Sequence, residues 1–270
     1  TYTVDFSSYE NGKDGEIDLS KINYMRVFFA HTFISDEINM KISNVKIVDS
    51  TNICTVPSIF SDGMMLQQNK DISVWGTAKP GNTITVKISK ADGTAVTSKE
   101  VKVGTDGSWK TKLDKQAGSY TKYKMEILDN GDSVKTINNI LIGEVWLACG
   151  QSNMALNVGS DMDSENILAN ATNDNIRIFL EPTYPYGQTG TQLYDPTYDV
   201  QGAYWGSGND KDAVNKTSAV AYAFAKKLQS QLNVPVAVLN TPIGGTVIEG
   251  WLPREAIQGG LIGSALGKII

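Results

Sequence analysis

The sequence predicts a multidomain protein in which an immunoglobulin-like β-sandwich is followed by an incomplete α/β doubly wound domain. Three observations lead to this prediction. The 270 residues are enough for more than one domain. Much of the first half alternates apolar and polar residues with period two. After residue 140, strand patterns alternate with helical ones, which is typical of an α/β sheet. A mean hydropathy of −0.21 and 41% apolar residues fit a globular chain.

Residues 1–50 are expected to be the C-terminal end of an upstream, β-rich domain. The runs 22–29 and 38–48 are rich in β-branched and aromatic residues. Two to four strands cannot close a sandwich alone. Residues 42–49 resemble the last strand of a β-sandwich carbohydrate-binding module, so sugar binding is one interpretation of this segment. Core packing of its aromatic residues is the interpretation we favour.

Residues 51–140 carry the strongest β pattern of the chain. The runs 72–75, 83–88 and 123–128 alternate with period two. Turn sequences separate the runs at regular spacing: Pro80-Gly81-Asn82, Asp92-Gly93, Asp106-Gly107 and Asn130-Gly131-Asp132. About seven short strands in this length predict an immunoglobulin-like sandwich.

Residues 141–270 are expected to be the first part of an α/β domain. Strands are predicted at 142–148, 176–180 and 234–239, and helices from residue 152 and at 214–232. The second helix carries Val220, Phe224, Leu228 and Leu232 on one face, and Thr217 or Ser218 is placed to cap it. About three sheet strands are visible where such domains usually have about five or six. The sheet is therefore expected to be cut short at residue 270.

The charge distribution argues against nucleic acid and membranes as partners. The formal net charge is −5, and it comes from residues 141–270, which hold 7 basic and 12 acidic residues. A phosphate backbone or an anionic membrane would require clustered positive charge. No apolar run approaches the ~20 residues of a membrane span.

Metal and cofactor sites are not expected. Zinc requires three or four nitrogen or sulfur ligands at short spacing, and the chain has one His and two Cys. Cys54 and Cys149 fall on opposite sides of the expected domain boundary. We therefore predict two buried, small apolar side chains rather than a disulfide.

Ser152 is the first candidate catalytic residue. The sequence Gly150-Gln151-Ser152-Asn153-Met154 follows a predicted strand and opens a helix. Ser152 is then expected at the sheet edge where open α/β folds bind ligands. A helix start stabilises an anion by about 0.3–1 kcal/mol, which suits a nucleophilic serine and an oxyanion hole. A plain N-cap is the structural alternative. The G-x-S-x-G turn of α/β-hydrolases is absent, which disfavours that fold.

A second candidate cluster follows the predicted strand 234–239. Gly244 and Gly245 allow backbone N–H groups to turn toward a ligand, which would supply a further oxyanion donor. A strand-ending turn is the alternative. Trp251 would either form the wall of a sugar site or pack against its neighbours, and we favour packing.

Four separated motifs, in order over about residues 55–260, resemble the sialate O-acetylesterase family. They are Pro57-Ser58-Ile59-Phe60-Ser61-Asp62-Gly63-Met64-Met65-Leu66-Gln67-Gln68 with Val74-Trp75-Gly76, Gly143-Glu144-Val145-Trp146-Leu147 with Gly150-Gln151-Ser152-Asn153-Met154, Ser218-Ala219-Val220, and Gly244-Gly245-Thr246-Val247-Ile248-Glu249-Gly250-Trp251. The resemblance implies an SGNH-type esterase domain behind a β-sandwich, with residues 51–140 and 141–270 as the two parts.

The resemblance also implies an activity and its residues. Ser152 would be the nucleophile that removes O-acetyl groups from sugars, and its N–H would form the oxyanion hole with Gly244 and Gly245. The residues expected to wall the substrate or support the site are Gln151, Asn153, Glu249 and Trp251. The implied substrate is an acetylated oligosaccharide or polysaccharide (sialic acid or plant polysaccharide), and the implied location is extracellular or periplasmic.

The chain departs from the family at its C-terminal end. The family places a further oxyanion block and its Asp and His pair beyond the position where this sequence stops. His31 matches no motif and is expected to have no catalytic role. We therefore expect the 270-residue chain alone to be nearly inactive.

Two other functions stay open. One is a non-catalytic carbohydrate-binding or scaffold piece. The other is an SGNH lipase or thioesterase, which would need an apolar acyl pocket, whereas residues 181–205 are rich in Tyr, Thr, Gln and Gly.

Overall fold

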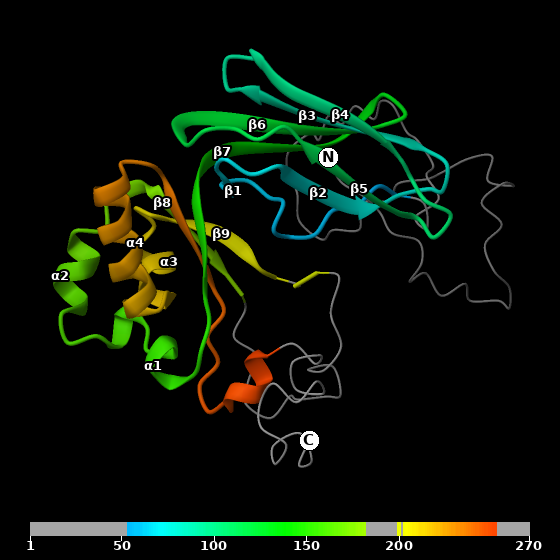
Figure 1. Ribbon diagram of the computed structural model, residues 1–270. Coiled ribbons are helices and arrows are strands. Elements are labelled where there is room, and N and C mark those ends of the chain that lie inside the picture. Colours follow the sequence, from blue (N-terminus) through cyan, green and yellow to red (C-terminus); the bar gives the residue numbers. More distant parts are fainter. Residues whose placement is uncertain (1–52, 182–198, 201, 253–270) are drawn as a thin grey trace, which may run out of the picture. The chain divides into compact units, whose positions relative to one another are not determined.

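The computed structural model describes residues 53–181, 199–200 and 202–252 (Figure 1). The described residues from Cys54 onward belong to one compact unit. The predictions for residues 1–50 lie outside the described residues. In chain order, the elements are β1 (Met65–Gln67), β2 (Ile72–Thr77), β3 (Thr83–Lys90), β4 (Ala95–Lys102), β5 (Ser108–Leu113), β6 (Ser119–Asp129), β7 (Asp132–Ala148), α1 (Ser152–Ala155), η3 (Val158–Ser160), α2 (Ser164–Ala169), β8 (Asn173–Leu180), β9 (Tyr204–Gly208), α3 (Lys211–Lys216), α4 (Ala219–Leu232), β10 (Val236–Asn240) and η5 (Ile248–Trp251).

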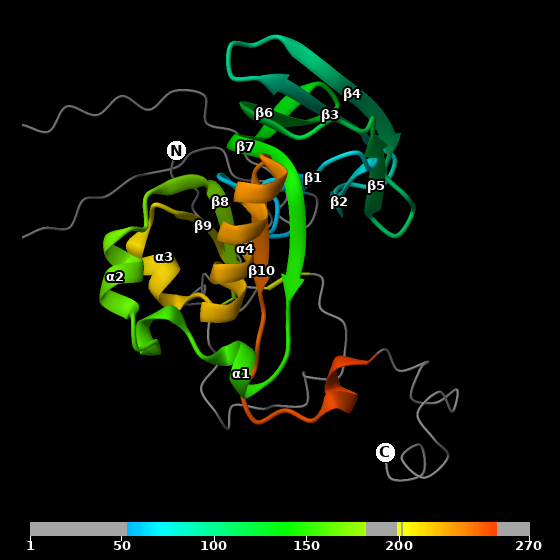
Figure 2. The same cartoon turned by 60° about the vertical axis from the view of Figure 1, so that its left-hand side comes forward.

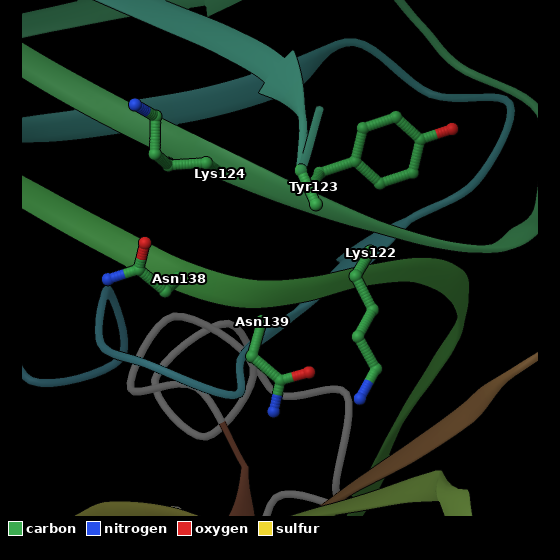
Figure 3. Close-up of a pocket in the computed structure, with 6 residues that line it drawn as sticks. Lys122, Tyr123, Lys124, Asn138 and Asn139 are labelled. Carbon is green, nitrogen blue, oxygen red and sulfur yellow. The ribbon is translucent and has the colours of Figure 1, made fainter. Parts of the chain in front are cut away.

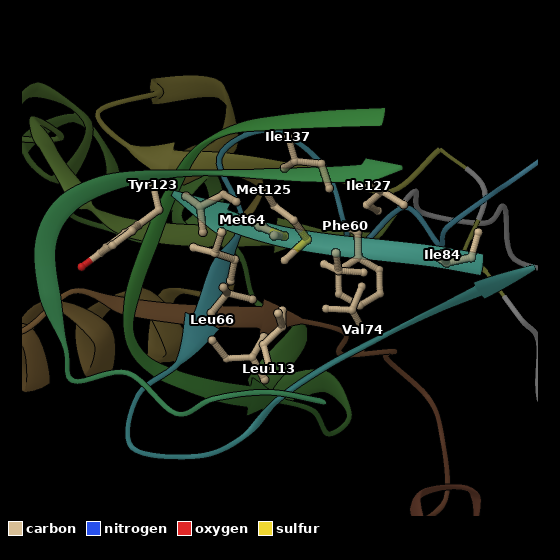
Figure 4. Packing of buried hydrophobic residues seen from close by; sticks show 14 of the residues in the cluster. Phe60, Met64, Leu66, Val74, Ile84, Leu113, Tyr123, Met125, Ile127 and Ile137 are labelled. Carbon is tan, nitrogen blue, oxygen red and sulfur yellow. The ribbon is translucent and has the colours of Figure 1, made fainter. Parts of the chain in front are cut away.

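The first part of this unit is antiparallel except for the short β1, which pairs in parallel with β7. Strands β4, β3, β6 and β7 pair in that order, and β2 pairs with β5 in a second, two-stranded sheet. Inward residues of both sheets, with Phe60 and Met64 from the loop before β1, form one apolar core (Figure 4). The period-two pattern predicted for residues 72–75, 83–88 and 123–128 is confirmed in β2, β3 and β6, where buried residues alternate with less buried ones. The immunoglobulin-like sandwich itself stays a prediction.

The predicted turns fall where the sequence places them. Gly81, Gly93, Gly107 and Gly131 all have φ between 80° and 92°, in the left-handed region that glycine enters without strain. Asn130, which precedes Gly131, also has a positive φ. This pair is the two-residue turn between β6 and β7 that the Asn-Gly sequence favours.

The second part is a mixed sheet with helices. Strands β7, β10 and β8 run parallel, and β9 joins β8 antiparallel. Helices α2, α3 and α4 lie on one side of these strands (Figures 1 and 2). Ile176, Ile178, Val236 and Val238 point toward the helices and are buried. Among the described residues only this face carries helices, so the second helical layer of a doubly wound sheet stays a prediction.

The strand predictions need correction mainly at their ends. Strand β7 begins ten residues before the predicted 142, because its first half pairs with β6 in a hairpin. It therefore runs across the expected domain boundary at residues 140/141. Strand β10 begins at Val236, after Pro235, whose carbonyl accepts a 2.9 Å hydrogen bond from the Glu144 N–H.

The predicted helix 214–232 is interrupted. It divides into α3 and α4, and Ser218 is the N-cap of α4, since its Oγ accepts from the Ala221 N–H. The predicted apolar face is largely exposed, with 53% of Val220, 41% of Phe224 and 48% of Leu232 accessible. The buried face instead carries Ala221, Tyr222 and Ala225. The two small Ala side chains allow the helix to lie close to the sheet.

The cysteine prediction is correct on bonding and wrong on burial. Both cysteines are free thiols, Cys54 is half-buried and Cys149 is exposed. Burial raises the pKa of the Cys54 thiol to about 11. Cys149 is exposed because it follows the last residue of β7, where the chain leaves the sheet. In the described part of the chain no helix is long and apolar enough to cross a bilayer.

The first family-like motif builds the scaffold. Asp199 accepts hydrogen bonds from the Ser58 N–H at 2.7 Å and from Ser58 Oγ at 2.9 Å. The Trp205 Nε1–H donates to the Ile59 carbonyl at 2.8 Å. These contacts join the loop before β1 to strand β9 and to the chain just ahead of it, so they connect the antiparallel part to the mixed sheet.

A cluster of amide side chains joins β1 to β7. Gln68 Nε2 donates to Glu144 Oε1 at 2.7 Å, and Gln67 Nε2 donates to the same oxygen at 3.3 Å. Gln67 Oε1 accepts from the Val145 N–H at 2.9 Å. The cluster satisfies that N–H, which points away from β10, and fixes the register of β7 where it enters the parallel sheet.

Gly143→Ala is predicted to destabilise the fold. A Cβ at this position would overlap the carbonyl oxygen of Pro235, so β7 and β10 would have to separate. Such overpacking costs about 1–3 kcal/mol. Chemical denaturation should show this loss of unfolding free energy, whereas exposed Ser98→Ala on β4 should change it by no more than about 0.5 kcal/mol. Equal stability of both variants would contradict the close approach.

Candidate active site

Three strands end in one row, and the candidate residues follow them. Asn240 of β10 is aligned with Ala148 of β7 on one side and with Leu180 of β8 on the other. The chain therefore leaves the sheet at the same edge three times. This edge is the carboxyl end of the parallel strands, where open α/β sheets bind ligands.

Ser152 follows β7 through a tight turn. Gly150 has φ +139°, and the Gln151 carbonyl accepts 2.9 Å hydrogen bonds from the N–H groups of Met154 and Ala155. Ser152 is exposed, and its Oγ donates to Gln151 Oε1 at 2.7 Å. The backbone N–H of Ser152 bonds to no acceptor in the described part of the chain. The hydroxyl and this N–H are thus both presented at the sheet edge.

Helix α1 is shorter than the sequence suggested. It has only four residues, Ser152–Ala155, so it cannot develop the dipole that a long helix would direct at an anion. The prediction of a helix-start field at Ser152 is therefore corrected. Any stabilisation of negative charge here has to come from individual N–H groups.

The glycine loop after β10 runs beside this turn. The Thr241 N–H donates to the Ala148 carbonyl at 3.0 Å, and the Ile243 N–H donates to the Gly150 carbonyl at 2.9 Å. Gly244 and Gly245 follow directly, and Gly245 has φ +79°. The expected proximity of the two loops is thus observed. The roles of Gly244 and Gly245 in an oxyanion hole stay predictions.

The family-like motif Ser218-Ala219-Val220 at the start of α4 bonds to two segments of the site. The Asn240 Oδ1 accepts from the Ser218 N–H at 2.9 Å, and the Leu156 carbonyl accepts from the Ala219 N–H at 2.9 Å. Ser218 is fully buried. These bonds attach the start of α4 both to the end of β10 and to the segment after α1. The motif therefore holds the segment that directly follows Ser152 and α1.

The other candidate residues are less closely grouped. Asn153 is exposed on α1. The Trp251 indole N–H donates to Thr246 Oγ1 at 2.9 Å, and that hydroxyl donates to the Ile243 carbonyl at 2.8 Å. Trp251 thus braces the glycine loop, which agrees with the packing interpretation. Glu249 lies in η5, and its side chain is outside the described residues.

Sequence reasoning missed Glu181. It follows β8 directly, so it lies at the same sheet edge as Ser152. Burial raises the pKa of this carboxyl above that of an ordinary Glu. The available signal was an acidic residue immediately after a strand of apolar residues.

The described part of this edge lacks a histidine, because the one His of the chain is His31, which falls outside the described residues. Within those residues there is also no group of three or more His, Cys, Asp or Glu side chains placed to hold a metal ion.

Comparison with known proteins shows a similarity to sialate O-acetylesterases. The sialate O-acetylesterases of Homo sapiens and Pongo abelii are 30% identical over 211 residues, and that of Rattus norvegicus is 27% identical over 215. The matches cover 74% of this chain. Over this stretch the chain is similar to the sialate O-acetylesterases. No protein-family model matches it.

A solved structure supports this assignment. The carbohydrate acetylesterase of Xanthomonas citri is 27% identical, with a TM-score of 0.65 over 76% of this chain and 44% of the other. The family resemblance predicted from the motifs is thereby confirmed, and the mixed sheet with helices fits an α/β carbohydrate esterase fold. The matches span 38–39% of the length of the curated family members.

Glu181→Gln is predicted to stabilise the protein at neutral pH. The raised pKa means that the folded state prefers the protonated carboxyl, so the stability this group contributes at low pH is lost as the pH rises through the ordinary Glu range and the folded pKa. Gln resembles the protonated form. Unfolding at pH 7.5 should show the variant more stable, and the gap should shrink near pH 4. Exposed Glu100→Gln is the control, and a gap independent of pH would contradict the burial argument.

Proposed function

We propose that this chain is the serine-bearing part of a carbohydrate O-acetylesterase of the SGNH type, with Ser152 as nucleophile. The observation that carries the proposal is the Ser152 turn, which lies at the carboxyl edge of the parallel strands and is hydrogen-bonded to the glycine loop through Gly150 and Ile243. The names of the matched family members supply the substrate class, an acetylated sugar.

The proposed chemistry is an acyl transfer in two steps. Ser152 Oγ attacks the acetyl carbonyl carbon, its proton passes to a general base, and the sugar hydroxyl leaves with a proton. Water then releases acetate from the acetyl-serine by the same route. The carbonyl oxygen, negative after each attack, would accept from the N–H groups of Ser152 and the Gly244–Gly245 loop. Gln151 Oε1 holds the resting hydroxyl at 2.7 Å.

The base is proposed to come from a further segment of the esterase domain. One side of β7 supports this extension, because residues 144–148 pair with β10 but with no other strand among the described residues. On this unpaired stretch of β7, 44% of the Trp146 surface and 62% of the Leu147 surface are exposed. The division at 51–140 and 141–270, with the immunoglobulin-like sandwich in the first part and an incomplete SGNH domain in the second, stays part of this proposal, and β7 runs through both parts.

The substrate is proposed to be an acetylated oligosaccharide or polysaccharide outside the cytoplasm, without nucleic acid or membrane as partner. A non-catalytic carbohydrate-binding or scaffold function is the second candidate. It is favoured by the lack of a histidine at the described part of the sheet edge. The mapping of a covalent adduct separates the two functions.

Ser152 is expected to be the residue that a serine-reactive phosphonate labels in the complete enzyme. Peptide mapping should place the adduct on Ser152, and Ser152→Ala should abolish labelling because the attacking oxygen is removed. Cys149→Ser is the matched control, since its exposed thiol lies three positions away and should not affect labelling. An adduct elsewhere, or none in an active preparation, would overturn the assignment.

Residues 1–270 expressed alone are expected to release acetate from an aryl acetate only slowly. Without a base the hydroxyl stays a neutral alcohol, and an oxyanion hole with binding alone leaves about 10³–10⁴-fold catalysis over water. His31→Ala should leave the rate unchanged. Robust turnover that this substitution abolishes would contradict both the missing base and the non-catalytic role of His31.

A further inference from the structure

A recess of about 300 Å³ between β6 and β7 does not form a ligand site. Lys122, Lys124, Asn138 and Asn139 are among the residues that line it. In Figure 3 the ammonium groups of Lys122 and Lys124 point to opposite sides of the strand pair. Lys122 is also already paired with Asp174 at 2.9 Å. The polar groups of this recess therefore do not converge on one ligand.

A smaller pocket lies between the outer face of β2 and the loop that precedes β1. It has a volume of about 180 Å³. Most of its wall is apolar and comes from Ile59, Phe60, Met64, Met65, Trp75 and Val145. Phe60, Met64 and Met65 are buried, whereas Trp75 and Val145 are half-buried. The pocket thus has a floor that the protein core holds in place and a more accessible rim.

The wall of this pocket suits an aromatic ring. The ring centroids of Phe60 and Trp75 are 4.7 Å apart, and their planes meet edge to face at 78°. A further ring can extend this arrangement, which the charge distribution of aromatic rings favours. Met64 and Met65 add polarizable sulfur atoms, which make favourable contacts with ring edges.

The volume admits one ring with a small substituent. An apolar cavity of about 150 Å³, lined by aliphatic and aromatic side chains, holds benzene. The pocket beside β2 is slightly larger, at about 180 Å³. A single six-membered ring therefore fits, and a fused ring system or a long acyl chain does not.

Two polar side chains of the rim are available to a ligand. Asp71 and Ser73 line the pocket, and neither side chain forms a hydrogen bond or ion pair with another described residue. Gln67, a third polar residue of the lining, already binds Glu144 and the Val145 N–H. The available groups are a carboxylate, which only accepts, and a hydroxyl. A ligand with a hydrogen-bond donor at the rim would match them.

The charges near the rim favour a neutral ligand. Lys110 is aligned with Trp75, and Lys112 with Ser73, in the antiparallel pair of β2 and β5. Residues directly opposite each other share a face, so both lysines belong to the same outer face as the pocket. A cationic ligand would be repelled by these lysines and an anionic one by Asp71. A hydroxyl can donate to the carboxylate without bringing a charge.

The pocket is separate from the candidate active site. Val145 packs with Met65 on the face of the mixed sheet away from the helices. Trp146, the next residue of β7, points to the opposite face, where its ring meets Phe224 of α4. Helix α1, which begins at Ser152, packs against α4 as well.

We propose that this pocket binds a small neutral phenol, an aromatic ring that carries a hydroxyl group. The ring lies against Phe60, Trp75 and Met65, and its hydroxyl donates to the Asp71 carboxylate. The site does not depend on Ser152 or on the esterase proposal. Its effect would be to hold a phenolic group on the antiparallel part of the protein.

Methionine methyl groups report this binding directly. The chain is labelled with ¹³C at the methionine methyl groups and titrated with phenol, while NMR follows the signals. The Met64 and Met65 signals are expected to shift. Met125, buried in the same core but outside the pocket lining, and Met154, on α1, should keep their positions.

Two further probes test the parts of the ligand. Anisole has the ring of phenol but a methoxy group in place of the hydroxyl, so it cannot donate to Asp71. It should bind at least about threefold more weakly than phenol, the size of one hydrogen bond. Cyclohexanol has the hydroxyl on a ring that is not aromatic, and it should bind at least about twofold more weakly.

Variants locate the site. Asp71→Ala should weaken phenol binding about threefold or more and leave anisole binding unchanged. Val145→Phe, which fills the pocket, should weaken both at least about tenfold, and unchanged Met125 and Met154 signals would show that the variant is folded. Glu100→Ala, an exposed acidic residue of β4, is the matched control and should bind phenol like the parent chain.

Ser152→Ala should also bind phenol unchanged, so failure of the esterase proposal does not affect this result. Four outcomes would each overturn the proposal: no shift of the Met64 and Met65 signals, equal binding of phenol and anisole, undiminished phenol binding in Asp71→Ala, or loss of binding in Ser152→Ala.

Discussion

The pairing of β7 with β10 is the interaction on which the remaining structure depends. Residues 144–148 of β7 lie in parallel register with β10, and Gly143 allows the Pro235 backbone to approach where that register begins. The first half of the same strand belongs to the antiparallel part. A shift of one residue in the register would turn Trp146 away from Phe224, which its ring meets at 5.3 Å, and would expose the inward side chains. Strand β7 therefore sets the position of the Ser152 turn, which follows its last residue closely.

Most of the residues that reveal the family serve this architecture. Ser58 binds Asp199, and Gln68 binds Glu144. Ser218 caps a helix and bonds to Asn240. Buried or half-buried polar groups of this kind tolerate few replacements, because each partner would lose its hydrogen bond. A motif can therefore identify a family through its scaffold while only a short stretch around Ser152 lies where chemistry could occur.

The sequence predicted what local rules determine. Turn glycines follow from the φ values they alone adopt easily, and the shared edge of the strands follows from parallel pairing. It failed where tertiary packing decides. The length of β7 depends on a hairpin partner, and the buried face of α4 was chosen by close approach of Ala221 and Ala225 rather than by its largest apolar side chains. The four-residue length of α1 could not be predicted from the sequence either, since apolar periodicity does not show where a helix ends.

In the proposed chemistry, the short helix changes how negative charge near Ser152 would be stabilised. A long helix would act over several ångströms, so a modest error in loop position would matter little. Individual N–H groups act only at about 2.7–3.1 Å, and geometry then decides their contribution. The bonds from Thr241 and Ile243 to the strand end and turn of β7 set that geometry, with Trp251 bracing the loop through Thr246. The distance between the glycine loop and Ser152 is therefore the quantity that catalysis at this edge would depend on most.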